Sequence, residues 1–369
     1  MPSYEKLNEL SSKISKRAIG RLLSLRQQLN EIPQRTQKET LLLATWNIRE
    51  FDSTTYGPRM KEAIYYIAEI IARFDLVALQ EVNRNLDALE DLMGILGGHW
   101  NYIITDTTEG DQGNDERLAF VYDTRKVKHS GLAGELVLPP VPERDAQGKI
   151  MKNAEGKTIY KPVFQLWRTP YICGFTAGWC DFMLATVHIQ WGKSIAEPEP
   201  RIEEIRNVAQ FLKNRTEDEK AWARNLILLG DFNIWKPNNK TFKELEKAEF
   251  VIPDQIQNLP ADISKKMHYD QIAFRVREKK MELTGKAGVF EFYKSVYRDE
   301  DRKIYEEYMP EGYWKKSDGS DRPEDGAYSK KGYYEKWRTY QMSDHYPMWV
   351  ELRIDYSDTY LEKQLEEID

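Results

Sequence analysis

Cysteine and long apolar segments are scarce in this sequence. Only Cys173 and Cys180 occur among its 369 residues, and both fall around one expected hairpin, so a disulfide framework is excluded. Two reduced thiols are typical of a cytoplasmic protein. The chain has no apolar run of about 18 residues, which excludes a membrane-spanning helix. Its first residues also lack the basic and then apolar pattern of a secretion signal. We therefore expect a cytoplasmic protein without a membrane span.

An excess of positive charge is also absent, since the formal net charge is -6. A chain without a broad basic surface is not expected to bind nucleic acid tightly and nonspecifically. A nuclease is not excluded, because bound metal ions supply positive charge locally. The hydrophobic content of 41% and the charged content of 31% are typical of a folded globular protein.

The first 38 residues are expected to form a helical extension. Leucine and isoleucine recur at spacings of three or four between residues 4 and 32, and Pro33 ends the pattern. One interpretation is a helix packed on the main body, and the other is a two-chain coiled coil that mediates self-association. The first is favoured because fewer than four clean heptads are present. The remaining residues, 39–369, are expected to form the main domain.

The rest of the chain predicts an α/β protein in which strands dominate. Amphipathic patterns predict helices over residues 60–74, 200–213 and 241–248. Apolar runs predict buried strands at residues 41–46, 75–79, 118–122, 171–176, 182–187, 226–229, 271–274 and 348–354. Interleaved helices and strands of this kind favour two sheets packed face to face with helices outside.

Two stretches have the composition of insertions. Residues 139–161 contain a near repeat, Asp-Ala-Gln-Gly-Lys followed by Asn-Ala-Glu-Gly-Lys, which predicts a protruding hairpin with tight turns. Residues 286–338 are rich in tyrosine and tryptophan, and their charges roughly cancel. One interpretation is a small helical subdomain with packed rings, and the other is a platform on which bases stack. The first is favoured because balanced charge provides no electrostatic track.

Oxygen-bearing side chains follow several of the predicted strands. Asn47, Glu81 and the Gly-Asp-Phe-Asn run that holds Asp231 and Asn233 each come directly after a buried strand, and Asp344 lies in a Ser-Asp-His run near the end. A single strand-end aspartate is more often a turn or cap residue. Four such motifs in one chain favour a site for a hard cation such as Mg²⁺, which prefers oxygen ligands.

The chain has five histidines, and two of them have acidic companions in the sequence pattern. We pair His188 with Glu116 and His345 with Asp270. A carboxylate on one ring nitrogen fixes the tautomer and raises the basicity of the other nitrogen. Two such pairs provide one general base and one general acid, as an in-line displacement at phosphorus requires. The other three, which we interpret as structural or surface residues, are His99, His129 and His268.

These motifs, in this order, resemble the endonuclease/exonuclease/phosphatase superfamily, and within it deoxyribonuclease I-like members. The resemblance runs from about residue 41 to residue 353 and is broken by the two insertions. Its pieces are Trp46-Asn47, Gln80-Glu81, Glu116-Arg117-Leu118, Arg168-Thr169-Pro170, Val187-His188, Gly230-Asp231-Phe232-Asn233, Tyr269-Asp270 and Ser343-Asp344-His345-Tyr346-Pro347.

The resemblance implies a four-layered α/β/β/α sandwich with one active cleft at the strand ends, and it makes residues 39–369 the catalytic domain. It implies Mg²⁺ as the cofactor, with Mn²⁺ or Ca²⁺ as alternatives. The metal region would be formed by Asn47, Glu81, Asp231 and Asp344. The base would be His345 with Asp270, and the acid would be His188 with Glu116. Asp231 and Asn233 would orient the nucleophile, and the scissile phosphate would be bound by Arg168, Asn233 and Tyr269.

The implied activity is a Mg²⁺-dependent phosphodiester hydrolase, with an endonuclease cleaving DNA as the first hypothesis. His188 stands where abasic-site endonucleases of the superfamily usually carry asparagine, which favours the other branches. Secreted deoxyribonucleases grip the minor groove with an arginine and a tyrosine, where this chain has Asn83 and Asn114. The alternative is therefore a phosphatase or phosphodiesterase for a small nucleotide or lipid-headgroup phosphoester. A non-enzymatic scaffold is a third hypothesis, and it is disfavoured because no catalytic residue is visibly lost.

Overall fold

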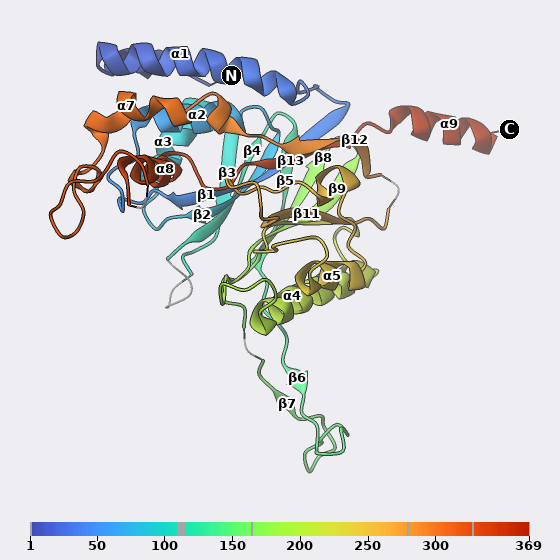
Figure 1. Ribbon diagram of the computed structural model, residues 1–369. Helices are drawn as coiled ribbons and strands as arrows, with labels where there is room; N and C mark the ends of the chain where they lie inside the picture. Colours follow the sequence, from blue (N-terminus) through green and yellow to red (C-terminus); the bar gives the residue numbers. More distant parts are fainter. Residues whose placement is uncertain (1, 109–114, 164, 279, 327, 369) are drawn as a thin grey trace.

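The computed structural model describes residues 2–108, 115–163, 165–278, 280–326 and 328–368, and two sheets form its centre (Figure 1). The first sheet has six strands in the order β12-β13-β1-β2-β4-β3. Its strands are β1 (Thr40–Phe51), β2 (Leu76–Val82), β3 (Trp100–Ile104), β4 (Arg117–Asp123), β12 (Glu282–Val289) and β13 (Met348–Arg353). The second sheet has five strands in the order β11-β10-β9-β8-β5. Its strands are β5 (Val127–Glu135), β8 (Tyr171–Ala177), β9 (Cys180–His188), β10 (Leu226–Asp231) and β11 (Asp270–Arg275).

The two sheets pack face to face through one apolar core. The ring of Phe120 on β4 lies 5.6 Å from the ring of Tyr171 and 5.5 Å from that of Phe175, both on β8. Leucine side chains from both sheets are fully buried between these rings, such as Leu43 on β1 and Leu228 on β10. Burial of apolar area on this scale is the main stabilising contribution to the fold.

Helices cover the outer faces of both sheets, which completes the predicted four-layered arrangement (Figure 1). The second sheet is covered by α4 (Glu199–Glu217) and α5 (Lys240–Lys247), and the first mainly by α2 (Lys61–Ile71) and α3 (Asp87–Leu96). The other helices are α1 (Ser12–Gln28), α6 (Asp254–Gln257), α7 (Arg302–Tyr305), α8 (Lys330–Gln341) and α9 (Ser357–Ile368). The α/β sandwich expected from the sequence is therefore confirmed.

The strands that the apolar runs did not predict all lie at sheet edges. β3 and β12 are the two edges of the first sheet, and β5 is an edge of the second. Most side chains of β5 and β12 are exposed or half-buried. An edge strand is covered less on its faces, so its sequence carries less of the apolar pattern from which central strands are predicted.

The N-terminal helix α1 packs on the body, as the favoured interpretation expected. Its buried residues are Ala18, Leu22 and Leu25, which join the core over the first sheet. Arg17 forms an ion pair with the buried Glu62 of α2, with 3.0 Å between Nη2 and Oε1. Because α1 shares a core with α2, removing residues 1–38 would expose apolar surface. The division of the chain at residue 38 stays a prediction.

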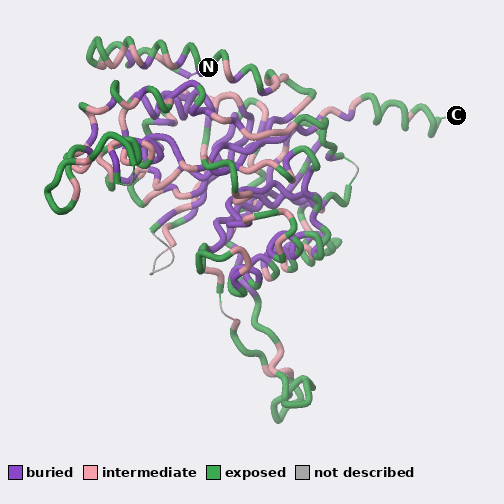
Figure 2. The backbone as a smooth tube through the Cα atoms, viewed as in Figure 1, coloured by how far each residue is buried: buried purple, intermediate pink, exposed green. Residues whose placement is uncertain are grey.

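The predicted hairpin over residues 139–161 protrudes from the body, and most of it is exposed (Figure 2). Its stem is a pair of short strands, β6 (Val141–Pro142) and β7 (Tyr160–Lys161). The near repeat forms two tandem turns, in which Asp145 and Asn153 accept the backbone N–H groups of Lys149 and Lys157. Each turn has a glycine with positive φ, so the repeated sequence encodes a repeated turn.

The aromatic residues of segment 286–338 are largely buried. Tyr297, Tyr305 and Trp337 are at most 1% exposed, and the rings of Tyr297 and Tyr305 stack with centroids 4.5 Å apart. This confirms packed rings rather than an open stacking platform within the segment. The rings share the core that contains α1 and α2, so the segment does not form a separate core.

Two further features of the structure bear on the sequence analysis, namely the state of the two cysteines and the length and polarity of the helices. Cys173 and Cys180 lie on the β8–β9 hairpin, and both are free and buried. Burial raises the pKa of each thiol to about 12. Within the described ranges, every helix is too short or too polar to cross a membrane.

We predict that the α1 interface is an integral part of the stability of the fold. Leu25→Ala should lower the free energy of unfolding by about 2–5 kcal/mol, because the side chain is fully buried. Leu23→Ala is the matched control on the same helix, since Leu23 is 65% exposed, and it should change stability by about 0.5 kcal/mol or less. Urea unfolding followed by circular dichroism measures both, and equal midpoints for the two variants would contradict the packing.

Candidate active site

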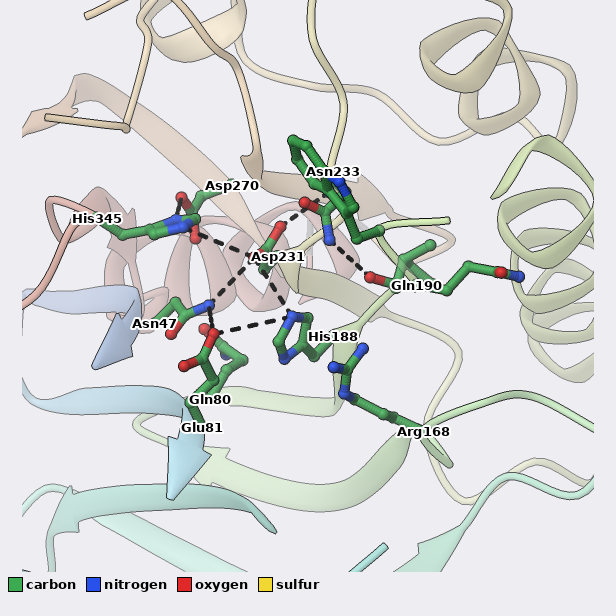
Figure 3. A network of polar contacts seen from close by, with 12 residues as sticks. Asn47, Gln80, Glu81, Arg168, His188, Gln190, Asp231, Asn233, Asp270 and His345 are labelled. Atoms are coloured by element: carbon green, nitrogen blue, oxygen red, sulfur yellow. Dashed lines mark hydrogen bonds and ion pairs between the residues drawn. The ribbon is translucent and has the colours of Figure 1, made fainter. Parts of the chain in front are cut away.

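Strand register brings the predicted site residues to one end of the two sheets (Figure 3). In the second sheet, Asp231 at the end of β10 lies opposite His188 on β9 and opposite Asp270 on β11. In the first sheet, Asn47 on β1 lies opposite Gln80 on β2, directly before Glu81. The site is therefore built at the ends of β1, β2, β9, β10 and the edge strand β11, whose positions the buried core fixes.

A close approach of two backbones precedes Asp231. Gly230 has φ of +130°, and a Cβ atom added there would lie 2.1 Å from the carbonyl oxygen of Val187 on β9. Only glycine accommodates both this conformation and this contact. Glycine is therefore required at this position of the Gly-Asp-Phe-Asn motif, because it allows the chain directly before Asp231 to approach β9 closely.

The carboxylate of Asp231 occupies the centre of the site and is 2% exposed. Its Oδ2 accepts a hydrogen bond from Asn47 Nδ2 at 3.1 Å, and its Oδ1 accepts one from the backbone N–H of Asn233 at 2.8 Å. The same Oδ2 lies 3.6 Å from Nε2 of His188 and 3.8 Å from Nε2 of His345. Burial opposes ionisation, but the two imidazoles and these hydrogen bonds outweigh it and lower the pKa of Asp231.

On one side of Asp231, His345 is paired with Asp270. His345 Nδ1 lies 2.7 Å from Asp270 Oδ2, and Asp270 is fully buried. Ser343 Oγ accepts from the backbone N–H of His345 and donates to the carbonyl oxygen of Asn47 at 2.6 Å, so it joins the final loop to β1. Burial alone would lower the pKa of His345. Asp270 and Asp231 outweigh burial, and the pKa lies well above its ordinary value.

On the other side, His188 is paired with Glu116. His188 Nδ1 lies 2.6 Å from Glu116 Oε1, and the same oxygen forms an ion pair with Arg168. Burial and Arg168 lower the pKa of His188, but Glu116 and Asp231 raise it further, so the net direction is upward. Arg168 was predicted to bind a substrate phosphate. In the structure, Arg168 Nε forms an ion pair with Glu116, and the guanidinium lies beside His188 (Figure 3).

The side-chain oxygens of Asn47 and Glu81 lie next to the carboxylate of Asp231, and we call this group of atoms the oxygen corner. Asn47 Nδ2 donates to Glu81 Oε1 at 2.9 Å, and the other carboxylate oxygen of Glu81 accepts the backbone N–H of Glu50 at 2.9 Å. Asn47 Oδ1 is buried and accepts no hydrogen bond from the described residues. Glu81 and Asn233 both have positive φ, a strained conformation that is frequent at functional sites.

This corner fits a divalent cation. Glu81, Glu116 and His188 offer ligand atoms that all lie within 4.8 Å of one another. Glu116 is already engaged by His188 and Arg168, so we favour the oxygens of Asn47, Glu81 and Asp231 as the donor set. An unpartnered buried amide oxygen next to two carboxylates is what a hard, oxygen-preferring cation requires.

Asp344 was expected to complete the metal region, and the structure gives its carboxylate a different partner. Asp344 Oδ2 lies 3.1 Å from Arg49 Nη1, and Arg49 also donates to Thr339 and Tyr340 of α8. The role of Asp344 as a metal ligand stays a prediction. The sequence analysis did not identify Arg49. Its position two residues after Asn47 on β1 could have indicated that it lies at the site, because side chains two residues apart lie on the same face of a strand.

A groove of about 410 Å³ adjoins His345 and leads towards the second insertion. Its lining includes Tyr269, Asp344 and Arg49, together with Lys336 and Thr339 of α8. The tyrosine-rich segment therefore forms one wall beside the site. Among the other predicted residues, Asn114 lies outside the described part of the chain.

The end of the two-sheet sandwich thus brings together a buried aspartate, two imidazoles that are each paired with a carboxylate, and a group of oxygen atoms that could hold a cation. A curated deoxyribonuclease from Thioalkalivibrio sp. (strain K90mix) is 28% identical over 202 residues, which are 53% of this chain and 46% of that protein. The chain thus spans less than half the length of this relative. The name of this relative agrees with the deoxyribonuclease-like resemblance that the motifs predicted.

Solved structures with similarity to the chain include two further proteins. The human Nocturnin catalytic domain with bound sulfate is 14% identical at a TM-score of 0.49, covering 85% of this chain and 94% of that chain. An endonuclease/exonuclease/phosphatase family protein from Leptotrichia buccalis C-1013-b is 16% identical at a TM-score of 0.49, covering 84% of this chain and 98% of that chain. No protein-family model matches the chain.

We predict that Asp270 raises the pKa of His345. In the Asp270→Asn variant without added metal, the His345 ring should titrate at a lower pH than in the wild type, because the negative charge that stabilises the imidazolium is removed. Nuclear magnetic resonance of the ring nitrogens measures the titration. Asp181→Asn, at an exposed position on β9, is the control and should leave it unchanged. An unchanged or higher pKa in Asp270→Asn would contradict the pairing.

Proposed function

We propose that this chain is a divalent-metal-dependent phosphoester hydrolase that cleaves phosphodiester bonds of nucleic acid, with DNA as the favoured substrate. The observation that carries the proposal is the position of Asp231 between two imidazoles, each bound to its own carboxylate. This arrangement supplies a base on one side and an acid on the other, as in-line attack on phosphorus requires.

The environments of the two histidines support different roles for them. His345 faces only carboxylates among its main charged neighbours, so it is the stronger proton acceptor and the proposed base. His188 has the cation of Arg168 beside it, which favours release of a proton, so it is the proposed acid. His345 takes a proton from the attacking water as the new P–O bond forms. His188 gives a proton to the leaving oxygen as the old P–O bond breaks.

The proposed cofactor is Mg²⁺, with Mn²⁺ or Ca²⁺ as alternatives, held by Asn47, Glu81 and Asp231. When bound, such a cation stabilises the negative charge that develops on the phosphate oxygens. Asn233 is proposed to bind the scissile phosphate and Asp231 to orient the water. Asp231 is fixed for this by the hydrogen bonds from Asn47 and from the backbone of Asn233.

A small phosphoester, either a nucleotide or a lipid headgroup, is the second candidate substrate. The net charge of -6 favours it, as does the wall that α8 forms on one side of the groove beside His345. The acid, the base and the metal corner serve both substrates equally. A non-enzymatic scaffold does not explain why these groups converge. The two free thiols favour a reducing compartment such as the cytoplasm.

The proposed metal site can be tested by measuring the affinity for Mg²⁺, without any measurement of activity. Glu81→Gln should weaken Mg²⁺ binding at least about ten-fold, because one charged ligand is lost from the corner. Isothermal titration calorimetry in the absence of substrate measures the affinity. Glu39→Gln removes an exposed carboxylate directly before β1 and should leave the affinity unchanged. Equal affinities for wild type and Glu81→Gln would place the cation elsewhere.

Activity is tested with plasmid DNA, single-stranded DNA, RNA and a panel of small phosphoesters in the presence of Mg²⁺. The wild type should cleave a phosphodiester, and His188→Ala and His345→Ala should each lower kcat by about 10²–10⁴-fold. His129→Ala changes a histidine remote from the site and is the control. If the wild type cleaves nothing, or if Glu81→Gln is as active as the wild type, the proposal is wrong. Release of phosphate from small esters alone would support the second candidate.

A further inference from the structure

A line of aromatic rings extends from the reaction centre on the side of His345. The ring of Tyr269 lies 5.5 Å from that of His345, and the ring of Trp191 lies 5.6 Å from that of Tyr269. Trp235 lies 6.0 Å beyond Trp191. The two tryptophans come from the connections that follow β9 and β10, close to His188 and Asp231 in the sequence. The chemistry proposed above uses neither tryptophan.

Trp191 is exposed and at the same time held in place. It is 39% exposed, whereas Arg201 on α4 is fully buried beneath it. Arg201 donates hydrogen bonds to the carbonyl oxygens of Gln190 and Trp191, and its guanidinium lies 5.3 Å from the Trp191 ring centroid. A ring anchored in this way loses little conformational freedom when a ligand stacks on it.

We infer that the exposed face of Trp191 is a stacking platform for a nucleobase that neighbours the scissile phosphate, and that the substrate strand is therefore single-stranded. The ring of Tyr269 meets that of Trp191 edge-on, at an interplanar angle of 77°, so it supports this face and does not extend it. This inference rests on the function proposed above and specifies its substrate. Stacking on aromatic side chains requires no sequence preference, because every base has a flat face. A base inside a duplex is already stacked on both faces and cannot reach the platform without unpairing.

The charge of the chain agrees with this mode of binding. A protein that grips a duplex without sequence preference relies on many phosphate contacts from basic side chains. This chain carries a net charge of -6, so binding has to depend on local contacts. Stacking next to a cation at the oxygen corner provides such contacts over a short stretch of one strand.

The test compares a short single-stranded thymidine oligomer with an oligomer of the same length in which every sugar is abasic. The wild type should hydrolyse the base-bearing oligomer with a kcat/KM about ten-fold to a hundred-fold higher than the abasic one, which is the range expected for stacking of one base. Trp191→Ala should bring this ratio close to one, and Trp191→Phe should retain most of it. A duplex of the same sequence should react more slowly than the single strand with the wild type.

The matched control is Trp222→Ala. Trp222 is 43% exposed, close to the value for Trp191, but it precedes β10 at the end of the strand opposite to Asp231. This variant should keep the wild-type ratio. If the ratio is unchanged in Trp191→Ala, or if the duplex is the faster substrate, the stacking inference is wrong while the hydrolase proposal stands. If the wild type hydrolyses neither oligomer nor any other phosphodiester, the proposed function itself is wrong.

Discussion

The buried carboxylate of Asp231 is the group on which the rest of the site depends. An isolated carboxylate is very costly to bury unless hydrogen bonds and opposite charges compensate it. Here Asn47 and the backbone of Asn233 supply the hydrogen bonds, and the rings of His188 and His345 supply positive charge when they are protonated. The outer carboxylates of Glu116 and Asp270 favour the protonated form of each ring and fix its orientation. The constellation is therefore one connected electrostatic unit.

The geometry of this unit follows from strand register rather than from loops. Because side chains alternate across a strand, a slip of one residue in β10 would turn Asp231 away from His188. The core prevents such a slip, since the residues before Asp231 on β10 are fully buried. Gly230 adds a local constraint by permitting the close approach to β9. The packing that stabilises the fold thus also positions the proposed acid and the proposed base.

The central part of the fold was predictable because buried strands leave a local pattern. The histidine–carboxylate pairs join distant residues, 75 positions apart for His345 and Asp270, so they were predictable from the set and order of the motifs and not from local spacing. Buried strands appear in the sequence as apolar runs, and the polar residues directly after those runs indicate a functional site. Edge strands such as β5 and β12 leave weaker patterns, because their side chains are largely exposed. The ion pair of Arg49 with Asp344 joins residues almost 300 positions apart, so no spacing in the sequence reveals it. The aromatic line through Trp191 has the same origin, since its rings come from three separate connections.

The catalytic groups by themselves do not select a substrate, so the selection has to come from the surfaces around them. A diester and a monoester present the same phosphorus to His345 and His188. On one side, the groove beside His345 is walled by α8, which carries Lys336. Beyond Tyr269, which also lines this groove, Trp191 presents a fixed aromatic face. A lipid-headgroup phosphoester has no base and gains nothing from that face, whereas a nucleotide or a strand with unpaired bases does. The anchoring of Trp191 by a buried arginine therefore favours a substrate that carries a base over a lipid headgroup.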